Sequence, residues 1–254
     1  MDSQSEIQRV YEELNRPSSA KLKQALKTEG IPFNAKQIDD LTRKETGRQL
    51  LAPTYKYTGK IVATDINERW AADLIDYTST PSKLLKYILV VQDIFTRKLY
   101  AKALLRNDSK TVATAFNQIV GSAKESPTEL NTDKGVEFTG NPFQVALRSL
   151  KIRHRVKDPM DRNAIATVDV AISNLKKALF RTGDDGISNW AERLDKVVAG
   201  INKTPHDHLR GSAPNDVKTK PQLQYFFKKE ASQDLRHNAD LIHKRAKKLI
   251  DDGA

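Results

Sequence analysis

The chain has 254 residues, 38% of them apolar and 30% charged, with a formal net charge of +11. No run approaches the ~18 apolar residues of a membrane span, and the charged N-terminus lacks the apolar segment of a secretory signal. We therefore expect an intracellular protein with no membrane partner, whose positive charge favours a polyanion such as nucleic acid. The absence of cysteine excludes disulfides, thiolate nucleophiles and cysteine-containing zinc sites.

Residues 5–50 predict a small helical module. "SSAKLKQALKTEG" combines a serine cap with an apolar-periodic run and a glycine stop at Gly30, and "NAKQIDDLTRKET" repeats the pattern with Asn34 as its cap. Two short helices with a tight link are typical of a helix-turn-helix module, and equally of a packing appendage. The segment "LLAPTYKYTGK" indicates a linker into the next domain.

Strand patterns follow the linker. "RWAADLIDYTS", "KLLKYILVVQDIF" and "KLYAKALLR" predict a three-stranded antiparallel meander. "SKTVATAFNQIVGSA" predicts a helix capped near Ser109, "PTELNTD" a short strand, "GNPFQVALRSL" a helix and "KIRHRVK" another strand. The run "NAIATVDVAISNLKKAL", residues 163–179, has the apolar spacing of a long helix with one buried stripe, and "SNWAERLDKVVAGIN" predicts one more helix.

This order of elements predicts an α/β fold. The expected architecture is a ribonuclease-H-like, mixed five-stranded sheet flanked by helices, with helical extensions at both ends. We divide the chain into an N-terminal helical segment and linker (1–61), a core (62–217) and a basic C-terminal helical tail (218–254).

Three acids occupy positions from which they could share metal ions. Asp73 lies inside the first strand, Asp133 ends the short fourth strand, and Asp169 lies on the border of the apolar stripe of the long helix. The first and fourth strands are expected to be neighbours, so the three carboxylates are expected to converge at one rim. Crowded carboxylates raise one another's pKa unless cations neutralise them, and two Mg²⁺ ions in such a site can drive phosphoryl transfer.

Each acid also has an ordinary structural explanation. Asp133 precedes a glycine and fits a turn aspartate, and Asp169 fits a solvated charge at the edge of a helix. Asp76 is three residues from Asp73 and therefore belongs to the opposite face of the strand. The acids that compete for a place in the site are Asp93, at a strand end, and Glu137, Asp158 and Asp161.

The motifs resemble those of retroviral and retrotransposon integrase cores. "WAADLIDY" resembles the W-x-x-D strand of that family, "VVQDIFTRKLYAKAL" its next strand pair, and "NTDKGVEFTG" its T-D-x-G-x-E-F motif. The 35 residues between Asp133 and Asp169 match the D-D-35-E spacing. "NWAERLDKVVAGINKTPHDHLRGSAPNDV" resembles the segment from a tryptophan to N-x-T-x-H, so the resemblance covers residues 62–217 as an integrase-like catalytic core.

The resemblance implies a DNA strand transferase. Asp73, Asp133 and Asp169 would hold two Mg²⁺ (or Mn²⁺) ions, which would serve 3′-end processing and the joining of element DNA to target DNA. The resemblance further implies double-stranded DNA (element ends and target) as partner, a homodimer or larger assembly, and a place of action in the nucleus. The residues expected to bind DNA phosphates are Lys134, Lys176 and Lys177, although plain solvated charge explains these lysines equally well.

Several departures from the family keep a second function open. The third acid is aspartate instead of glutamate, as in mariner-type transposases, and "DVAIS" replaces the usual E-R-x-N. The zinc module of the family cannot form without cysteine, and the chain stops at "LIDDGA", where relatives often continue into a small β-barrel. These features favour, as the alternative, a catalytically inactive, integrase-derived DNA-binding or scaffold protein. A nuclease of the ribonuclease H type is a third option, against which the "NTDKGVEF" and N-x-T-x-H features argue.

Overall fold

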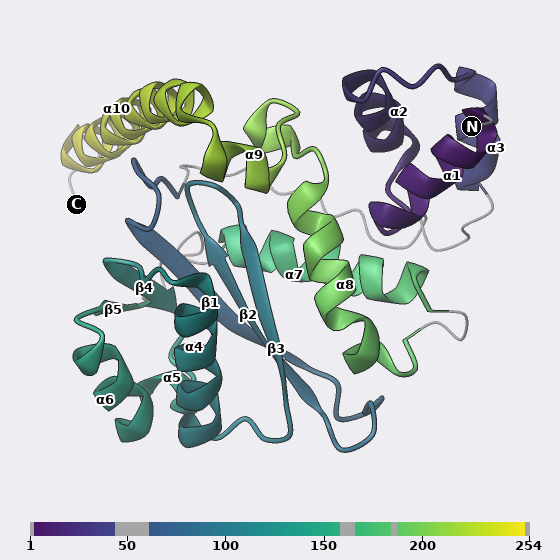
Figure 1. Cartoon of the computed structure of the whole chain (residues 1–254). Helices are drawn as coiled ribbons and strands as arrows, with labels where there is room; N and C mark the ends of the chain where they lie inside the picture. Colours follow the sequence, from purple (N-terminus) through teal and green to yellow (C-terminus); the bar gives the residue numbers. More distant parts are fainter. Residues whose placement is uncertain (1–2, 44–60, 158–165, 184–186, 252–254) are drawn as a thin grey trace.

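The computed structural model describes residues 3–43, 61–157, 166–183 and 187–251 (Figure 1). Its sheet has five strands in the order β3-β2-β1-β4-β5. The strands β1, β2 and β3 form an antiparallel meander, and β4 and β5 run parallel to β1. The predicted mixed five-stranded sheet is confirmed. The strand bounds are β1 Arg69–Asp76, β2 Tyr87–Asp93, β3 Leu99–Leu104, β4 Glu129–Thr132 and β5 Arg153–Val156.

Helices cover both faces of the sheet and bury two separate apolar layers (Figure 1). One face carries α4 (Ser109–Ala123), α5 (Val136–Thr139) and α6 (Asn141–Ser149), and the other carries α7 (Ala166–Arg181) and α8 (Trp190–Lys203). The short elements α5, η2 (Asp207–Leu209) and α9 (Pro214–Thr219) were not predicted. The cap of α4 is also corrected: Asp108, not Ser109, is the N-cap residue, and its carboxylate accepts a hydrogen bond from the Thr111 backbone N–H at 3.0 Å.

The alternation of side chains along β1 decides on which face of the sheet Asp73 lies. Trp70 and Ala72 belong to the apolar layer under α4, whereas Ala71 and Ile75 belong to the layer under α7. Successive side chains of a strand point to opposite faces, so Asp73 belongs to the α7 face. The exposed Asp76 belongs to the other face, as predicted from the three-residue step.

A buried acid fixes how the parallel half of the sheet is aligned. Glu129, whose side chain is 7% exposed, pairs with Arg69 on β1 and with Arg153 on β5, each at 2.8 Å. The three residues are direct partners in the strand register. A shift of one residue would leave this carboxylate buried without a cation, which is costly. The same register carries β1 and β4 forward together, so that Asp73 and Asp133 follow at the same level.

The N-terminal helices form a module with its own apolar core. The helices are α1 (Ser3–Glu13), α2 (Ser19–Thr28) and α3 (Ala35–Arg43), and they share a buried cluster that includes Leu22, Leu26 and Ile38. Gly30 has a φ of +70°, which suits the stop predicted after α2. Asn34 accepts a hydrogen bond from the Lys36 backbone N–H at 2.9 Å, which fits its predicted role as a cap. The predicted linker, residues 50–60, lies outside the described residues.

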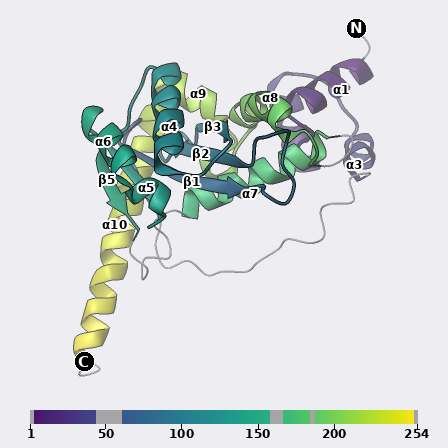
Figure 2. The same ribbon diagram turned by 90° about the horizontal axis from the view of Figure 1, so that it is seen from below.

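Polar contacts fasten this module to α7 and α8 (Figure 1, Figure 2). Asn15 is 1% exposed and donates a hydrogen bond to the Val197 carbonyl at 3.0 Å. The absence of a side chain at Gly200 makes room for it, because a Cβ there would lie 1.6 Å from Asn15 Nδ2. At the rim of the contact, Lys203 pairs with Glu13 at 2.7 Å.

The C-terminal helix α10 (Pro221–Asp251) confirms the predicted helical tail. Phe227 and Ala231 are buried, and beyond them the helix extends away from the sheet (Figure 2). No helix in the described ranges is both long and apolar enough to cross a bilayer.

We predict that Gly200→Ala destabilises the protein by about 1–2 kcal/mol, because the added methyl group displaces Asn15 and breaks a buried hydrogen bond. The loss should outweigh the gain in helix propensity, which is at most about 1 kcal/mol. The measurement is urea unfolding. The control is Gly121→Ala in α4, where nothing lies within 4 Å of the added Cβ, so that variant should be slightly stabilised. Equal behaviour of the two variants would contradict the proposed packing of Asn15.

Candidate active site

The carboxylates of Asp133, Asp169 and Glu137 act electrostatically on the carboxylate of Asp73, which lies on the central strand β1. The pKa of Asp73 is raised to about 6, first by burial and then by the negative charges of Asp133, Asp169 and Glu137. These acids come from β1, the turn after β4, the first turn of α7 and α5. We call these four residues the acid edge. Asp133 and Asp169 both act electrostatically on Asp73, whereas the expectation that the three acids meet at one rim as metal ligands stays a prediction.

Asp169 lies on the exposed border of its helix, as its place in the apolar pattern indicated. Partial burial raises the pKa of its carboxyl group most strongly, Lys157 opposes that rise, and Asp133 adds to it. The pKa of Asp169 therefore depends on the charges of both Asp133 and Lys157, the residue that follows β5.

Backbone groups hold two of the acids in place. The Leu74 N–H donates to Oδ1 of Asp73 at 2.8 Å, and the Gly135 N–H donates to Oδ1 of Asp133 at 3.0 Å. Gly135 also gives room to Glu137, because a Cβ at Gly135 would lie 2.5 Å from the Glu137 carboxylate. Each of the two aspartates keeps its second oxygen available for a ligand.

The acid edge fits a divalent cation in its chemistry. Carboxylate oxygens are the ligands that Mg²⁺ prefers, and repulsion among these acids is the condition that a cation relieves. The spacing is wider than a shared ion requires, because no three acidic or histidine side chains in the described ranges are grouped closely enough to hold one metal.

The competing acids have other roles or lie outside the described residues. Asp93 is 1% exposed and accepts hydrogen bonds from the Thr96 hydroxyl at 2.6 Å and from the Thr96 backbone N–H at 3.3 Å. It closes the β2–β3 turn at the end of the strand pair where Trp70 lies, which explains its position at a strand end. Asp158 and Asp161 fall in the segment 158–165, outside the described residues.

The predicted DNA-binding lysines are all exposed. Lys134 follows Asp133 directly, and Lys176 and Lys177 lie on α7, where Lys176 is close enough to lower the pKa of Asp76. Their contact with DNA stays a prediction. The sequence analysis did not identify Lys157, whose positive charge lowers the pKa of Asp169. The alternation in "RHRVK" could have indicated it, since Arg153, Arg155 and Lys157 share one face of that strand.

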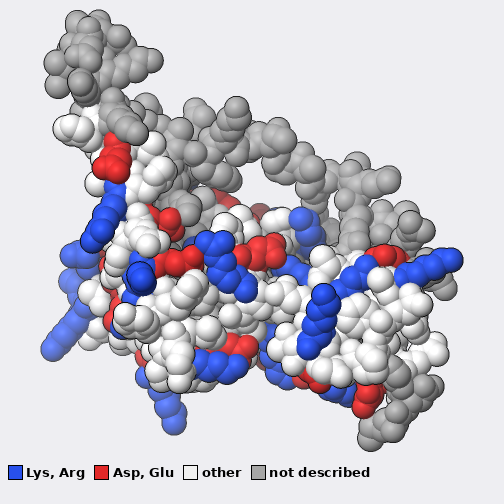
Figure 3. Space-filling model, turned by 90° about the horizontal axis from the view of Figure 1, so that it is seen from above, with Lys and Arg blue, Asp and Glu red and all other residues white. Residues whose placement is uncertain are grey.

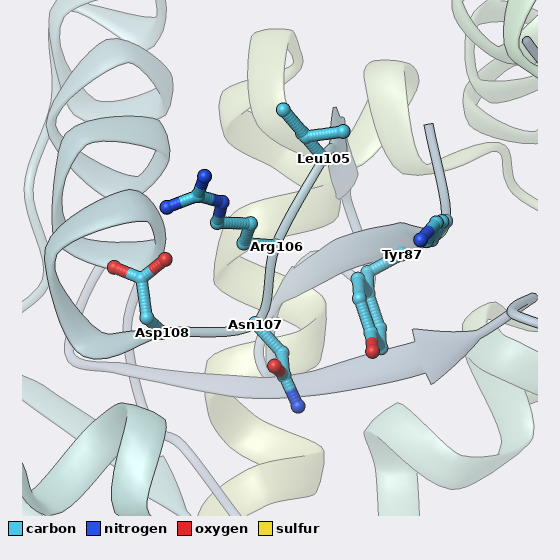
Figure 4. A pocket seen from close by; sticks show the side chains of 6 residues that line it. Tyr87, Leu105, Arg106, Asn107 and Asp108 are labelled. Carbon is cyan, nitrogen blue, oxygen red and sulfur yellow. The ribbon is translucent and has the colours of Figure 1, made fainter. Parts of the chain in front are cut away.

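On the face seen in Figure 3, positive charge is distributed among the described residues instead of forming one stripe. Figure 3 shows lysine and arginine side chains spread across the face seen from above, with acidic side chains among them. A hollow of about 340 Å³ lies at the start of α4 and is lined by Lys86, Tyr87, Leu105, Arg106, Asn107 and Asp108, none of which belongs to the acid edge (Figure 4). Within it the hydrogen bonds of Thr111 lower the pKa of Asp108 most strongly, and the charge of Arg106 contributes a smaller part.

The sheet order and the helices on both faces define a ribonuclease-H-like fold of the integrase architecture. Residues 63–161 match the family model of the integrase core domain. A curated relative, the Gag-Pol polyprotein of walleye dermal sarcoma virus, is 23% identical over 144 residues, which is 56% of this chain and 8% of the polyprotein. The chain thus spans less than a tenth of that relative. The predicted resemblance to retroviral-type integrase cores is confirmed.

Two solved structures are similar to this chain, and the first of them shares its fold. A simian T-cell lymphotropic virus intasome in complex with PP2A regulatory subunit B56 gamma has a TM-score of 0.53 and 19% identity, with 78% of this chain and 71% of that chain covered. The catalytic core domain of BIV integrase has a TM-score of 0.49 and 16% identity, with 63% and 99% covered. The family match contains Asp73 and Asp133 and ends before Asp169.

We predict that Asp73→Asn stabilises the metal-free protein at pH 8 by on the order of 1–2 kcal/mol, after a discount for partial solvent screening. The folded pKa of Asp73, about 6, is above its ordinary value of 3.8. The folded state therefore binds more protons than the unfolded state between these values, and stability falls as the pH rises from about 4 to 6. The neutral amide removes this penalty while still accepting from Leu74.

Urea unfolding in EDTA at several pH values tests this prediction. The advantage of Asp73→Asn should shrink toward pH 4. Asp76→Asn is the matched control, because Asp76 is exposed on the same strand and the Thr78 N–H, at 2.7 Å, lowers its pKa. A variant at Asp73 that is no more stable than the parent protein at pH 8 contradicts the assigned shift.

Proposed function

We propose that the protein is a metal-dependent polynucleotidyl transferase of the integrase type. Its reaction would be the processing of a 3′ end of element DNA and the joining of that end to target DNA. The observation that carries this proposal is that the negative charges of Asp133 and Asp169 raise the pKa of Asp73, and that of Asp133 raises the pKa of Asp169, in an integrase-type sheet. The match of residues 63–161 to the integrase core domain supports it.

Asp73, Asp133 and Asp169 are the residues that would hold two Mg²⁺ (or Mn²⁺) ions. Bound there, the ions would activate a water molecule or the 3′-hydroxyl of the DNA end as nucleophile and would neutralise charge on the leaving oxygen. The chain contributes the alignment of the acids: the Leu74 and Gly135 backbone N–H groups each hold one carboxylate oxygen and leave the other available. Asp169 is one methylene shorter than the usual glutamate, so its helix must approach the strands more closely.

Cations around the acid edge would bind the DNA backbone. Lys134, Lys176 and Lys177 are exposed, and Lys157 adds a charge beside Asp169. The overall charge of +11 favours double-stranded DNA as partner, both element ends and target. A structural neighbour is an intasome, which supports a homodimer or larger assembly on DNA. Action in the nucleus stays a prediction. The division of the chain at residues 61 and 217 stays a prediction.

Strand transfer on oligonucleotides that carry element ends, in Mg²⁺, tests the proposal. Asp133→Asn should lower the rate by at least about a hundredfold, the order of loss expected when a charge-stabilising group is removed. Asp169→Asn should do the same, whereas Asp169→Glu should keep measurable activity because it restores the reach of the usual third acid. Asp76→Asn is the control and should leave the rate unchanged. Activity that survives Asp133→Asn rules this mechanism out.

A catalytically inactive DNA-binding or scaffold protein is the second candidate function. It is favoured by the spacing of the acid edge and by the position of Asp169 beyond the family match. Titration calorimetry separates the two candidates. Salt-dependent DNA binding without any binding of Mg²⁺ or Mn²⁺ would favour the scaffold.

A further inference from the structure

A chain of side-chain hydrogen bonds runs from α6 through β5 to Asp133. The Gln144 amide nitrogen lies 2.8 Å from Nδ1 of His154, and Nε2 of His154 lies 2.9 Å from the Thr132 hydroxyl oxygen. The Thr132 hydroxyl donates to the Asp133 carbonyl at 2.8 Å. This series of hydrogen bonds thus ends on the backbone carbonyl of Asp133, a candidate metal ligand.

The partners of His154 fix its tautomer. The Thr132 hydroxyl uses its one proton on the Asp133 carbonyl, so it must accept from Nε2 of His154, which carries the ring proton. The Gln144 amide donates one proton to the Phe138 carbonyl at 2.7 Å and the other to Nδ1 of His154, which must be unprotonated. A neutral ring with the proton on Nε2 satisfies every group, and burial lowers the pKa of His154, which favours that neutral ring.

These side-chain hydrogen bonds fix the backbone at Asp133, just beyond the point where hydrogen bonding between strands ends. The last hydrogen bond between β4 and β5 at this end joins the Lys157 N–H to the Thr132 carbonyl at 2.8 Å. Asp133 is the first residue past the strand, and its carbonyl is held by a side chain instead of a neighbouring strand. Its carboxylate accepts a hydrogen bond from the Gly135 backbone N–H at 3.0 Å. Thr132 is fully buried, so water does not compete for its hydroxyl group.

We propose that His154 is a positioning residue which, through Thr132, orients Asp133 for its part in the acid edge. This inference rests on the proposed function for its consequence in catalysis, and on the hydrogen-bond geometry for the positioning itself. Partners of this kind behind a metal ligand commonly change metal affinity tenfold to a hundredfold when they are lost.

Amide hydrogen exchange of Gly135 reports on the positioning without metal or DNA. His154→Phe keeps an aromatic ring against Phe143, whose ring centroid lies 6.2 Å away, but removes both nitrogens. We expect exchange at Gly135 to become roughly three- to tenfold faster, the size of one net hydrogen bond. The Thr111 amide is the internal control, since it is bound to the Asp108 carboxylate in the same way at 3.0 Å and should not change.

A double-mutant cycle tests whether the hydrogen bonds of His154 and Thr132 are coupled. Thr132→Val removes the hydroxyl and should also speed exchange at Gly135. In the double variant with His154→Phe the effect should be no larger than that of the stronger single variant, because each change breaks the same chain. His154→Gln, which can still donate to Thr132, should restore slower exchange. An unchanged Gly135 amide in His154→Phe, or additive effects, overturns the proposal.

Mn²⁺ binding by calorimetry connects the positioning to the site. His154→Phe should weaken the Mn²⁺ Kd roughly tenfold to a hundredfold, with DNA affinity in EDTA unchanged. If the parent protein binds no Mn²⁺, the proposed function fails. Amide hydrogen exchange at Gly135 still decides in that case whether His154 orients Asp133. If Mn²⁺ binds the parent and His154→Phe equally, the role of His154 toward the site is refuted.

Discussion

The pairing of Glu129 with Arg69 and Arg153 is the constraint from which the geometry of the acid edge follows. Burial makes the carboxylate costly unless both guanidinium groups are present, so three strands are aligned at one level. Four residues later along β1 and β4, the same alignment brings Asp73 and Asp133 together. The ion pairs lie at the start of β1 and β4, whereas Asp73 lies in the middle of β1 and Asp133 directly follows β4. The placement of the candidate acids thus depends on the ion pairs.

The sequence was most informative where one residue decides a local outcome. Period-two alternation in β1 identified the face of Asp73, and the cap and stop residues Asn34 and Gly30 marked the ends of helices. The strand order followed from the sequence of elements. Asp108 was missed as the cap of α4 because it competes with the adjacent Ser109, and both residues are good caps. Short elements such as α5 and α9 were missed because four to six residues carry too little periodicity.

Contacts between distant segments could not be predicted from sequence. Nothing near His154 in the chain indicates that its two nitrogens find Gln144 and Thr132, since these partners come from different elements. The contact of Asn15 with the turn of α8 around Gly200 is likewise a matter of tertiary packing across 182 residues. The spacing of the acids depends on side-chain orientation in the same way. Residue type and interval identified the candidate acids, but neither gives the separation of their oxygens.

The long reach of α10 has a mechanical consequence. From Ala231, its last buried residue among those described, to Asp251 the helix rises roughly 30 Å at 1.5 Å per residue. A continuous helix resists bending, so a body held at its far end would keep a set direction relative to the sheet. Leu235 and Ile242 lie exposed along this arm, 45% and 68% accessible. Because its first turns are buried through Phe227 and Ala231, a stiff helix of this length fixes the distance and direction of its exposed half relative to the sheet.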